Sequence, residues 1–266
     1  MTRRRLDAEL VRRGLARSRE VAADLIAAGR VHVDSHVATK SATQVDPACA
    51  IVVRPSAGPD YVSRGAHKLA GALAAFTPSG LTVAGRRCLD AGASTGGFTD
   101  VLLREGAREV VAVDVGYGQL AWSLRTDDRV TALDRTNVRT LTAELIGGPV
   151  ELVVADLSFI SLELVLPALA GVTQPGGDLV VMVKPQFEVG RTRLGDGGVV
   201  REPALRSAAV RKIATAAAAL GLGVVGVTAS PLPGPAGNVE YFLWLRDAAP
   251  ALDPVDLDRA VKEGPQ

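Results

Sequence analysis

Two charged residues directly follow apolar runs that predict buried strands. Lys184 comes after "LVVMV" and precedes Pro185, and Asp156 ends the run "ELVVAD". Because the carboxyl ends of parallel strands line the ligand crevice of a sheet, both side chains are expected at one rim. A lysine whose pKa is lowered there by burial or by a second cation can accept a hydroxyl proton. Alternatively, Lys184 is an ordinary strand end that has reached the surface.

Two further charges are expected at this rim. Glu240 begins the apolar segment "EYFLWL", and the turn "PLPGPAG" before it is too short for a crossover helix, which predicts an antiparallel hairpin at the sheet edge. The start of such a strand lies beside the ends of its parallel neighbours. Lys68, in "SRGAHKL", precedes the first strand of the sheet.

These four residues form the candidate catalytic set: Lys68, Asp156, Lys184 and Glu240. We expect Lys184 nearest the reacting hydroxyl and Asp156 orienting it, with the other pair completing the network. The spacing leaves open which lysine is neutral. It also leaves open that the two acids only cap neighbouring turns.

A glycine-rich segment, "CLDAGASTGGF" (residues 88–98), follows a predicted strand and opens a helix. Asp114 ends "VVAVD", 22 residues after Gly92, and an acid in that place commonly holds ribose hydroxyls. A tight turn alone would explain the glycines, but the paired acid favours nucleotide binding. The pattern D-x-G-x-x-x-G differs from the G-x-G-x-x-G of NAD sites. It resembles the S-adenosylmethionine loop of class I methyltransferases.

That resemblance implies S-adenosylmethionine as cofactor and suggests its contacts. Asp90 would face the methionine ammonium, the turn Gly92–Gly97 would lie beneath the sulfonium ligand, and Asn137 is a candidate adenine contact. The expected cofactor-binding residues are Asp90, Gly92, Ala93, Ser94, Thr95, Gly96, Gly97, Phe98, Asp114, Asn137 and Asp156. No metal site is expected, because His32 and His36 fall in a predicted hairpin and the two cysteines match no metal spacing.

The charge of the chain is unevenly distributed. Its net charge is +1, yet residues 1–64 hold eleven Lys/Arg against seven Asp/Glu, so this part carries +4. Most of these arginines lie in the first thirty residues. A basic front end on a near-neutral body favours a polyanionic partner, although a solvated surface would have the same composition.

The basic front end predicts a small α+β unit. "RLDAELVRRG" has helical spacing and stops at Gly14, and Ser18 is a plausible N-cap for a second helix that ends at Gly29. "RVHVDSHVA" then predicts a hairpin with its turn at Asp34–Ser35, and "AIVVRP" predicts a further strand.

This unit resembles the S-four-type RNA-binding domain, whose two helices present a basic face to structured RNA. The resemblance implies phosphate contacts, which position RNA without reading its bases. They would come from Arg3, Arg4, Arg5, Arg17, Arg19 and Lys40. Candidates for extending this basic track beyond the unit are Arg64, Arg135 and Arg139.

Strands and helices alternate from residue 86 onward, which predicts an α/β fold with a doubly wound parallel sheet. We expect an S-four-type domain over residues 1–58, a linker over 59–63, a class I (Rossmann-like) methyltransferase domain over 64–249 and a tail over 250–266. Residues 213–239 lack charge, but glycines and prolines interrupt them, which argues against a membrane span. No apolar segment follows the first arginines, so we expect no signal peptide and a cytoplasmic protein.

Several motifs together resemble the TlyA family of FtsJ-related ribose 2′-O-methyltransferases along almost the whole chain. They are "VSRGAHKL", "CLDAGASTGGFTD", "ADLSFISL", "VKPQFEVG" and "GNVEYFLWL". The resemblance implies cytidine 2′-O-methylation in 16S and 23S ribosomal RNA, ribosomal subunits as partners, and an influence on capreomycin sensitivity. The family linker often reads Arg-x-Trp-Val, whereas residues 59–62 are "PDYV", which puts linker-mediated coupling of the domains in doubt. Residues 190–200 are expected to form a mobile loop beside Lys184 or an untethered surface loop.

Two other functions stay open at this point. One is a methyltransferase that acts on a protein or a small molecule and carries an incidental basic domain. The other, suggested by the historical family name hemolysin, is a membrane-active cytolysin. It would need a spanning or amphipathic segment, which the sequence does not show.

Overall fold

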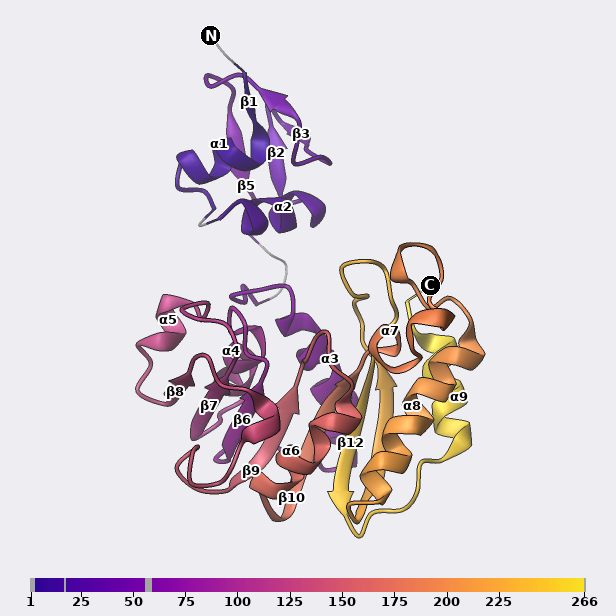
Figure 1. Cartoon of the computed structure of the whole chain (residues 1–266). Coiled ribbons are helices and arrows are strands. Elements are labelled where there is room, and N and C mark those ends of the chain that lie inside the picture. The colour runs from indigo at the N-terminus through magenta and orange to yellow at the C-terminus, as the bar shows by residue number, and fades with distance from the viewer. Residues whose placement is uncertain (1–2, 17, 56–58, 266) are drawn as a thin grey trace. The chain divides into compact units, whose positions relative to one another are not determined.

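The structure, a computed structural model, describes residues 3–16, 18–55 and 59–265, so the predicted RNA contact Arg17 lies outside the described residues. It divides into two compact units, Met1–Arg64 and Gly65–Gln266 (Figure 1). Among the described residues, no helix combines the length and the apolar character that crossing a membrane requires.

The described residues of the first unit form two short helices and two small antiparallel sheets. One sheet pairs β1 with β4, and the other has the order β3-β2-β5. Its elements are β1 (Arg4–Arg5), α1 (Leu6–Arg12), α2 (Arg19–Ala27), β2 (Val31–Val33), β3 (His36–Val37), β4 (Gln44–Val45) and β5 (Ile51–Val53).

Local signals in the sequence of this unit predict its two helices, the β2–β3 hairpin and β5 correctly, whereas the short β1–β4 pair was not predicted. Ser18 caps α2 by accepting a hydrogen bond of 3.2 Å from the Val21 amide. Asp34 and Ser35 both have positive φ, which is the geometry of a tight hairpin turn between β2 and β3. The core is small and lies between the helices and strands. It consists of Leu6, Leu10, Ala16, Ala22, Ile26, Val31 and Val45.

The second unit is built on a seven-stranded sheet of order β11-β12-β10-β9-β6-β7-β8. The strands are β6 (Arg87–Ala91), β7 (Glu109–Val113), β8 (Val130–Leu133), β9 (Val150–Ala155), β10 (Thr173–Val183), β11 (Leu222–Ala229) and β12 (Tyr241–Asp247). The helices are α3 (Ala66–Phe76), α4 (Gly97–Arg104), α5 (Trp122–Arg125), α6 (Leu166–Val172), α7 (Pro185–Glu188), α8 (Pro203–Ala218) and α9 (Pro254–Glu263).

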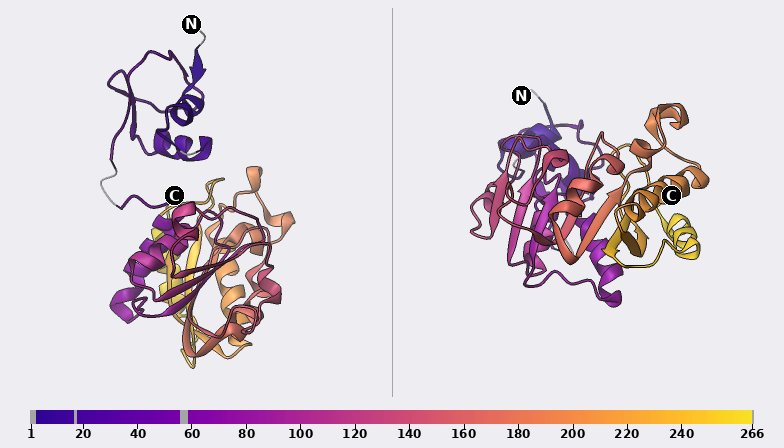
Figure 2. Two further views of the ribbon diagram at one scale, coloured as in Figure 1. Left: turned by 90° about the vertical axis from the view of Figure 1, so that its left-hand side faces the viewer. Right: turned by 60° about the horizontal axis from the view of Figure 1, so that its bottom comes forward.

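The sheet is mixed, as the sequence predicts. Strands β8, β7, β6, β9 and β10 are parallel, while β12 runs antiparallel between β10 and β11. The expected terminal hairpin is therefore confirmed, with β12 as its inner strand. Helices cover both faces of the sheet: the left view of Figure 2 shows the purple helices on one side and the orange α8 on the other.

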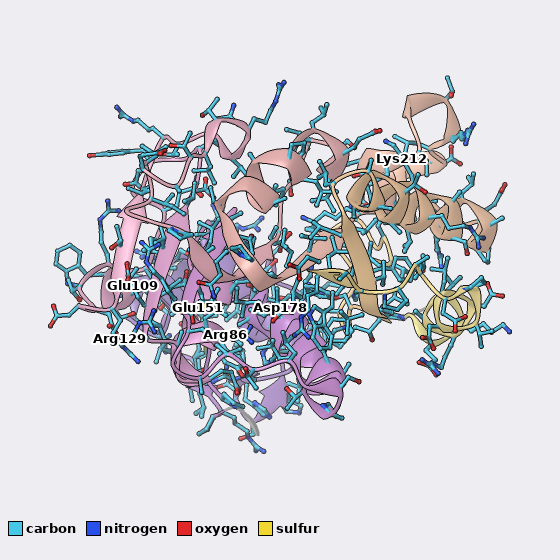
Figure 3. The ribbon with its side chains drawn as sticks, turned by 90° about the horizontal axis from the view of Figure 1, so that it is seen from below. Arg86, Glu109, Arg129, Glu151, Asp178 and Lys212 are labelled. Carbon is cyan, nitrogen blue, oxygen red and sulfur yellow. The ribbon has the colours of Figure 1, made fainter. Side chains whose placement is uncertain are left out.

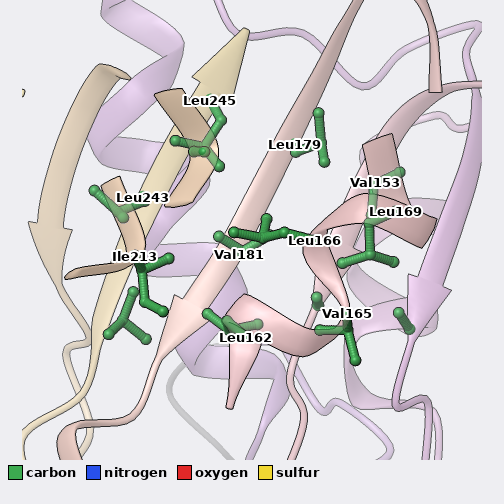
Figure 4. Close-up of a cluster of buried hydrophobic side chains, with 14 of the residues drawn as sticks. Val153, Leu162, Val165, Leu166, Leu169, Leu179, Val181, Ile213, Leu243 and Leu245 are labelled. Atoms are coloured by element: carbon green, nitrogen blue, oxygen red, sulfur yellow. The ribbon is translucent and has the colours of Figure 1, made fainter. Parts of the chain in front are cut away.

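Alternate residues of each strand face opposite layers of helices. Leu179, Val181 and Leu243 pack with α6 and α8 in the larger core cluster (Figure 4). On the other face, the ring of Trp244 lies 5.6 Å from Phe76 of α3, and that of Phe242 lies 6.1 Å from Phe98 of α4. The strand residues with even numbers in β10 and β12 thus face α3 and α4.

The amino ends of the parallel strands are held by a charged network (Figure 3). Asp178, at 0% exposure, accepts hydrogen bonds from Arg86 (2.5 Å), Arg246 (2.8 Å) and the Trp244 indole (2.6 Å). Burial alone would raise the pKa of Asp178, but these donors lower it below its ordinary value. The cluster joins β10 to β12 and to the residue before β6, so it fixes the hairpin at the end of the sheet opposite the rim.

The C-terminal tail contains a helix that the sequence analysis did not predict. Asp253 caps α9 by accepting a hydrogen bond of 2.7 Å from the Val255 amide. Leu257, Ala260 and Val261 of this helix join the core cluster beside α8 and β11. Helix α9 is therefore part of the packed second unit.

Candidate active site

The alternation of side chains along the strands and the register of strand pairing bring the predicted catalytic residues to one place. Val183 pairs with Tyr241, so one more step of this register sets Lys184 opposite Glu240. Asp156, which follows Ala155 of β9, is also an even-numbered residue. All three side chains should therefore face α3 and α4, and Lys68 lies in the first turn of α3. The structure thus gathers the four residues at the carboxyl rim, as the sequence analysis expects.

Lys68 and Glu240 form one ion pair. Their Nζ and Oε2 atoms lie 2.5 Å apart, and the two side chains are only 9% and 1% exposed. Gln186 Nε2 also donates to Glu240 Oε1 at 3.4 Å. Removing either charge would leave its partner buried and unpaired, which is strongly unfavourable.

Lys184 and Asp156 form the second ion pair. Lys184 Nζ lies 2.5 Å from Asp156 Oδ1, and it donates a hydrogen bond of 2.9 Å to the Ser158 hydroxyl. The Asp156 contact is close but not aligned as a hydrogen bond, so it acts mainly through charge. Asp156 is the more exposed member, at 22% of its side chain. The pair is therefore open to a substrate on one side.

The glycine-rich loop lies directly against this pair. Gly92 has φ +89°, and a Cβ added there would lie 2.5 Å from the backbone oxygen of Asp156. Gly96 has φ +97°, which also favours glycine. The Gly92 and Ala93 amides both donate to the Val113 carbonyl, so the loop is fixed to the end of β7. A larger residue at Gly92 would close the space beside Asp156, and one at Gly96 would collide with the side chains of Leu120 and Leu124.

Asp90 is a fully buried acid with one unused oxygen. Its Oδ2 accepts from the Thr99 hydroxyl at 2.7 Å, whereas Oδ1 has no partner among the described residues. Burial, with smaller effects from the Asp156 and Asp114 charges, raises the pKa of Asp90 to about 7. An unpartnered buried carboxylate oxygen is costly, and a cationic ligand group would satisfy it.

Asp114 and Asn137 have local partners. Both oxygens of Asp114 accept backbone hydrogen bonds, from Gly116 (2.7 Å) and Ser94 (2.8 Å), which hold the carboxylate beside the loop. Asn137 Oδ1 accepts from the Arg139 amide at 3.0 Å and caps a short 3-10 turn. Each oxygen of Asp114 retains acceptor capacity for a ribose hydroxyl.

Most of the remaining predicted cofactor residues lie in the loop and at the start of α4, whereas one of them faces the core. Ala93, Ser94 and Thr95 form the turn between β6 and α4, with Ser94 at φ +48°. Gly97 begins α4 and is buried. Phe98, by contrast, packs its ring against Phe242 in the core and is 4% exposed. Its side chain supports α4 from within the core.

Sequence reasoning missed several residues that surround the two ion pairs. Ser158 bonds Lys184, Gln186 bonds Glu240, and Thr99 bonds Asp90. Phe159 is 91% exposed at φ +65°, and its ring lies 5.3 Å from that of Phe187. All of them lie inside motifs quoted above, and the places of Ser158, Phe159 and Gln186 directly after β9 and Lys184 are a usable signal.

In the first unit, some of the expected RNA contacts already hydrogen-bond a carboxylate of the protein. Arg5 donates to both oxygens of Asp7 (2.9 and 3.1 Å), and Arg19 donates to Asp7 at 2.9 Å. The Arg5 hydrogen bonds hold the pKa of Asp7 well below its usual range. Both arginines keep further N–H groups, and their side chains are 44% and 59% exposed. Three other expected contacts are exposed at the surface: Arg3, Arg4 and Lys40.

The three arginines that are expected to extend the basic track are exposed at the surface. Arg64 is the last residue of that unit. In the second unit, Arg135 has φ +53° and its guanidinium lies 4.2 Å from the centre of the Tyr117 ring. Arg139 is exposed next to Asn137. Arg135 and Tyr117 together form an aromatic and cationic surface.

The loop over residues 190–200 is tethered at its end. Asn238, 2% exposed, donates to the Gly198 carbonyl at 3.0 Å and accepts from the Val200 amide at 2.8 Å. Arg206 also donates to the Val200 carbonyl at 3.0 Å. This end of the loop is therefore anchored two residues before Glu240, unlike an untethered surface loop.

Comparisons with known proteins agree with this geometry. The FtsJ-like methyltransferase family matches residues 61–247 and the S4 domain matches residues 4–48. The 16S/23S rRNA (cytidine-2′-O)-methyltransferase TlyA of Mycobacterium tuberculosis is 61% identical over 268 residues, with 99% of each chain covered.

Two other relatives carry the name hemolysin. Hemolysin A of Brachyspira hyodysenteriae is 36% identical over 90% of this chain and 98% of its own. A solved structure from Streptococcus thermophilus whose name includes hemolysin is 38% identical, covers 99% of this chain and 96% of its own, and has a TM-score of 0.78. The chain therefore belongs to the TlyA family and is an S-adenosylmethionine-dependent, FtsJ-like methyltransferase with an S4 domain.

Proposed function

We propose that this enzyme methylates the ribose 2′-hydroxyl of cytidines in ribosomal RNA, in the 16S RNA and also in the 23S RNA, within ribosomal subunits. The printed name of the Mycobacterium tuberculosis relative supports this substrate. The observation that carries the proposal is the pair of lysine–carboxylate contacts at the carboxyl rim, directly beside the glycine-rich loop. Such a substrate is met in the cytoplasm.

The residues of the site fit S-adenosylmethionine. Asp90 offers a buried, unpartnered Oδ1 for the methionine ammonium, and Asp114 offers acceptors for the ribose hydroxyls. Gly92 keeps the space beside Asp156 open. When bound there, the cofactor supplies an electrophilic methyl group whose leaving group is a neutral thioether, so no acid is needed to assist departure.

The chain's own residues handle the proton of the attacking hydroxyl. Lys184 Nζ, in its neutral form, accepts that proton, and Asp156 at 2.5 Å stabilises the resulting ammonium. Ser158 holds the Nζ atom in place from a second direction. Glu240 fixes Lys68 at the same rim, so that the two lysines line the path of the nucleotide. Orientation of the hydroxyl toward the methyl group supplies the rest of the acceleration.

Binding of the RNA would be divided between the two units. We assign phosphate contacts to the exposed arginines of residues 1–58, joined by the linker 59–63 to the catalytic domain 64–249. Arg64, Arg135 and Arg139 would extend these contacts. The exposed ring of Phe159, next to Lys184's partner Ser158, offers a stacking surface for a base that leaves its helix.

One experiment tests the proposal directly. The protein is incubated with methyl-labelled S-adenosylmethionine and unmodified 30S or 50S subunits, and 2′-O-methyl positions are mapped by reverse-transcription stops. We expect label at a cytidine with the wild-type protein and no label with Lys184→Ala. A protein of residues 64–266 that methylates a non-RNA substrate as fast as the full chain would favour the alternative function.

A further inference from the structure

Glu188 is a buried acid that the reaction described above does not use. It ends α7, four residues after Lys184, and its side chain is only 1% exposed. Its Oε2 accepts from the Ser161 hydroxyl at 2.6 Å and its Oε1 accepts from the Leu162 amide at 2.8 Å. Lys212 of α8 lies 3.2 Å from Oε2.

These contacts join the two segments that carry the active-site charges. Ser161 and Leu162 belong to the segment that leaves β9, which also carries Asp156 and Ser158. Glu188 belongs to the segment that leaves β10 and begins with Lys184. The carboxylate thus connects the two rim segments at the points where they turn away from the site.

Neither segment is held firmly by its own structure. Helix α7 has only four residues and forms one turn, which is too short to be stable alone. The β9 segment contains Phe159 at φ +65°, a conformation that costs energy for a bulky residue. Among the described residues, the segments also meet through the Phe159–Phe187 ring pair, through the contacts of Lys184 with Asp156 and Ser158, and through Lys212, which lies 3.4 Å from the Ser161 hydroxyl. Glu188 therefore provides their buried connection.

We propose that Glu188 is a positioning residue for methyl transfer: it fixes the β9 and β10 segments so that Lys184 Nζ meets both Asp156 and Ser158. This inference rests on the proposed role of Lys184. The carboxylate acts through the Leu162 amide and the Ser161 hydroxyl, and it touches neither substrate nor cofactor. An ordinary stabilising ion pair with Lys212 would need none of these bonds to the β9 segment.

Neighbouring Glu163 offers a matched control. It pairs with the same Lys212 at 3.0 Å, but its side chain is 52% exposed and it does not bond the Ser161 hydroxyl or the Leu162 amide through its carboxylate. Figure 3 labels Lys212, the partner that the two acids share. Glu163→Gln therefore removes a partner of Lys212 and leaves the connection between the rim segments intact.

The experiment compares Glu188→Ala, Glu188→Gln and Glu163→Gln in the full chain. We expect Glu188→Ala to lower kcat on ribosomal subunits about 100-fold, because a misplacement of about 1 Å in a reacting group costs that much. The affinity for S-adenosylmethionine and the KM for subunits should stay within about twofold, since Glu188 contacts no ligand. Glu188→Gln retains an oxygen for the Leu162 amide. Its kcat should therefore be at least tenfold higher than that of Glu188→Ala, about the factor that one hydrogen bond supplies. Glu163→Gln should match the wild type.

Amide hydrogen exchange gives a readout that does not depend on the substrate. We expect exchange at Leu162 to increase in Glu188→Ala and to stay unchanged in Glu163→Gln. Unchanged kcat in Glu188→Ala, or equal losses in both Glu188→Ala and Glu163→Gln, would overturn the inference. If the wild type fails to label ribosomal RNA, the proposed function fails, whereas unchanged Leu162 exchange in Glu188→Ala would refute the positioning role by itself.

Discussion

Replacing Asp90 by asparagine should make the catalytic unit more stable and at the same time weaken cofactor binding. Asp90 is fully buried, and its pKa is raised from 3.8 to about 7 mainly by that burial. Because its folded pKa lies above its unfolded value, the folded state holds the extra proton between pH 4 and 7. Its contribution to stability is therefore greatest at low pH and is lost as the pH rises to 7.

The size of this effect follows from the two pKa values. A change from 3.8 to about 7 corresponds to about 4 kcal/mol in the free energy of unfolding above pH 7. Asparagine has the same shape, keeps an oxygen for the Thr99 hydroxyl and carries no charge. We expect Asp90→Asn to raise Tm by about 10 °C at pH 8 and to leave it nearly unchanged at pH 4.

The assay is thermal unfolding from pH 4 to 8.5, with and without S-adenosylmethionine. The ligand ammonium favours the charged carboxylate, so the ligand-induced rise in wild-type Tm should increase with pH through 7 and be small in the variant. As a control, Asp127→Asn should be less stable at pH 8, because the Arg129 hydrogen bond lowers the pKa of Asp127. A variant Asp90→Asn that is less stable than the wild type at pH 8 would refute this reasoning, as would equal ligand-induced shifts.

Three further predictions test other parts of the structure. Lys184→Arg places a permanent cation beside Asp156 and cannot serve as the base, so methyl transfer should fall by about 10²–10⁴ while S-adenosylmethionine still binds in calorimetry. Gly92→Ala should destabilise the catalytic unit by about 1–3 kcal/mol in urea and abolish cofactor binding, since the added Cβ would lie 2.5 Å from the Asp156 oxygen at φ +89°; normal affinity would contradict this. Asp7→Asn should lower the Tm of residues 1–64 at pH 7 and weaken RNA binding, although it removes a negative charge, because Arg5 and Arg19 lose their shared partner. The lowered pKa of Asp7 means that this difference in Tm should disappear as the pH falls below 4.

The positions of three of the four charged residues could be predicted because they depend on regular structure. An apolar run fixes where a strand ends, and parallel strands end at one rim, so Asp156 and Lys184 must meet there. Glu240 follows from the short turn that makes β12 antiparallel. These arguments need only the direction of each strand and the alternation of its side chains between the two faces of the sheet.

Side-chain partners that depend on loop conformation could not be predicted in this way. The bond from Lys184 to Ser158 requires the path of the segment after β9, which no periodic pattern describes. A count of arginines does not reveal that Arg5 and Arg19 share Asp7. Phe98 belongs to the glycine-rich motif, but its ring faces the core. The first turn of α4 sets the direction of that ring, and the motif does not reveal it.

Helix α9 was predictable but was missed. Asp253 before Pro254 is a helix start signal, and Leu257, Ala260 and Val261 recur at helical spacing. The short stretch between β12 and this helix, residues 248–253 ("AAPALD"), shows no strand pattern, so the sequence analysis assigns the segment after it to a tail although it packs against α8 and β11. Amphipathic spacing near the end of a chain is therefore informative even where no strand follows.

The place of β12 has a consequence for how the enzyme is made. Because β12 lies between β10 and β11, strand β10 has an open apolar edge until residues 241–247 have left the ribosome during translation. A nascent chain stopped before residue 240 would lack the acid that pairs with Lys68 and would expose a strand prone to aggregation. This chain therefore cannot form its complete site before residues 240–247 have been synthesised.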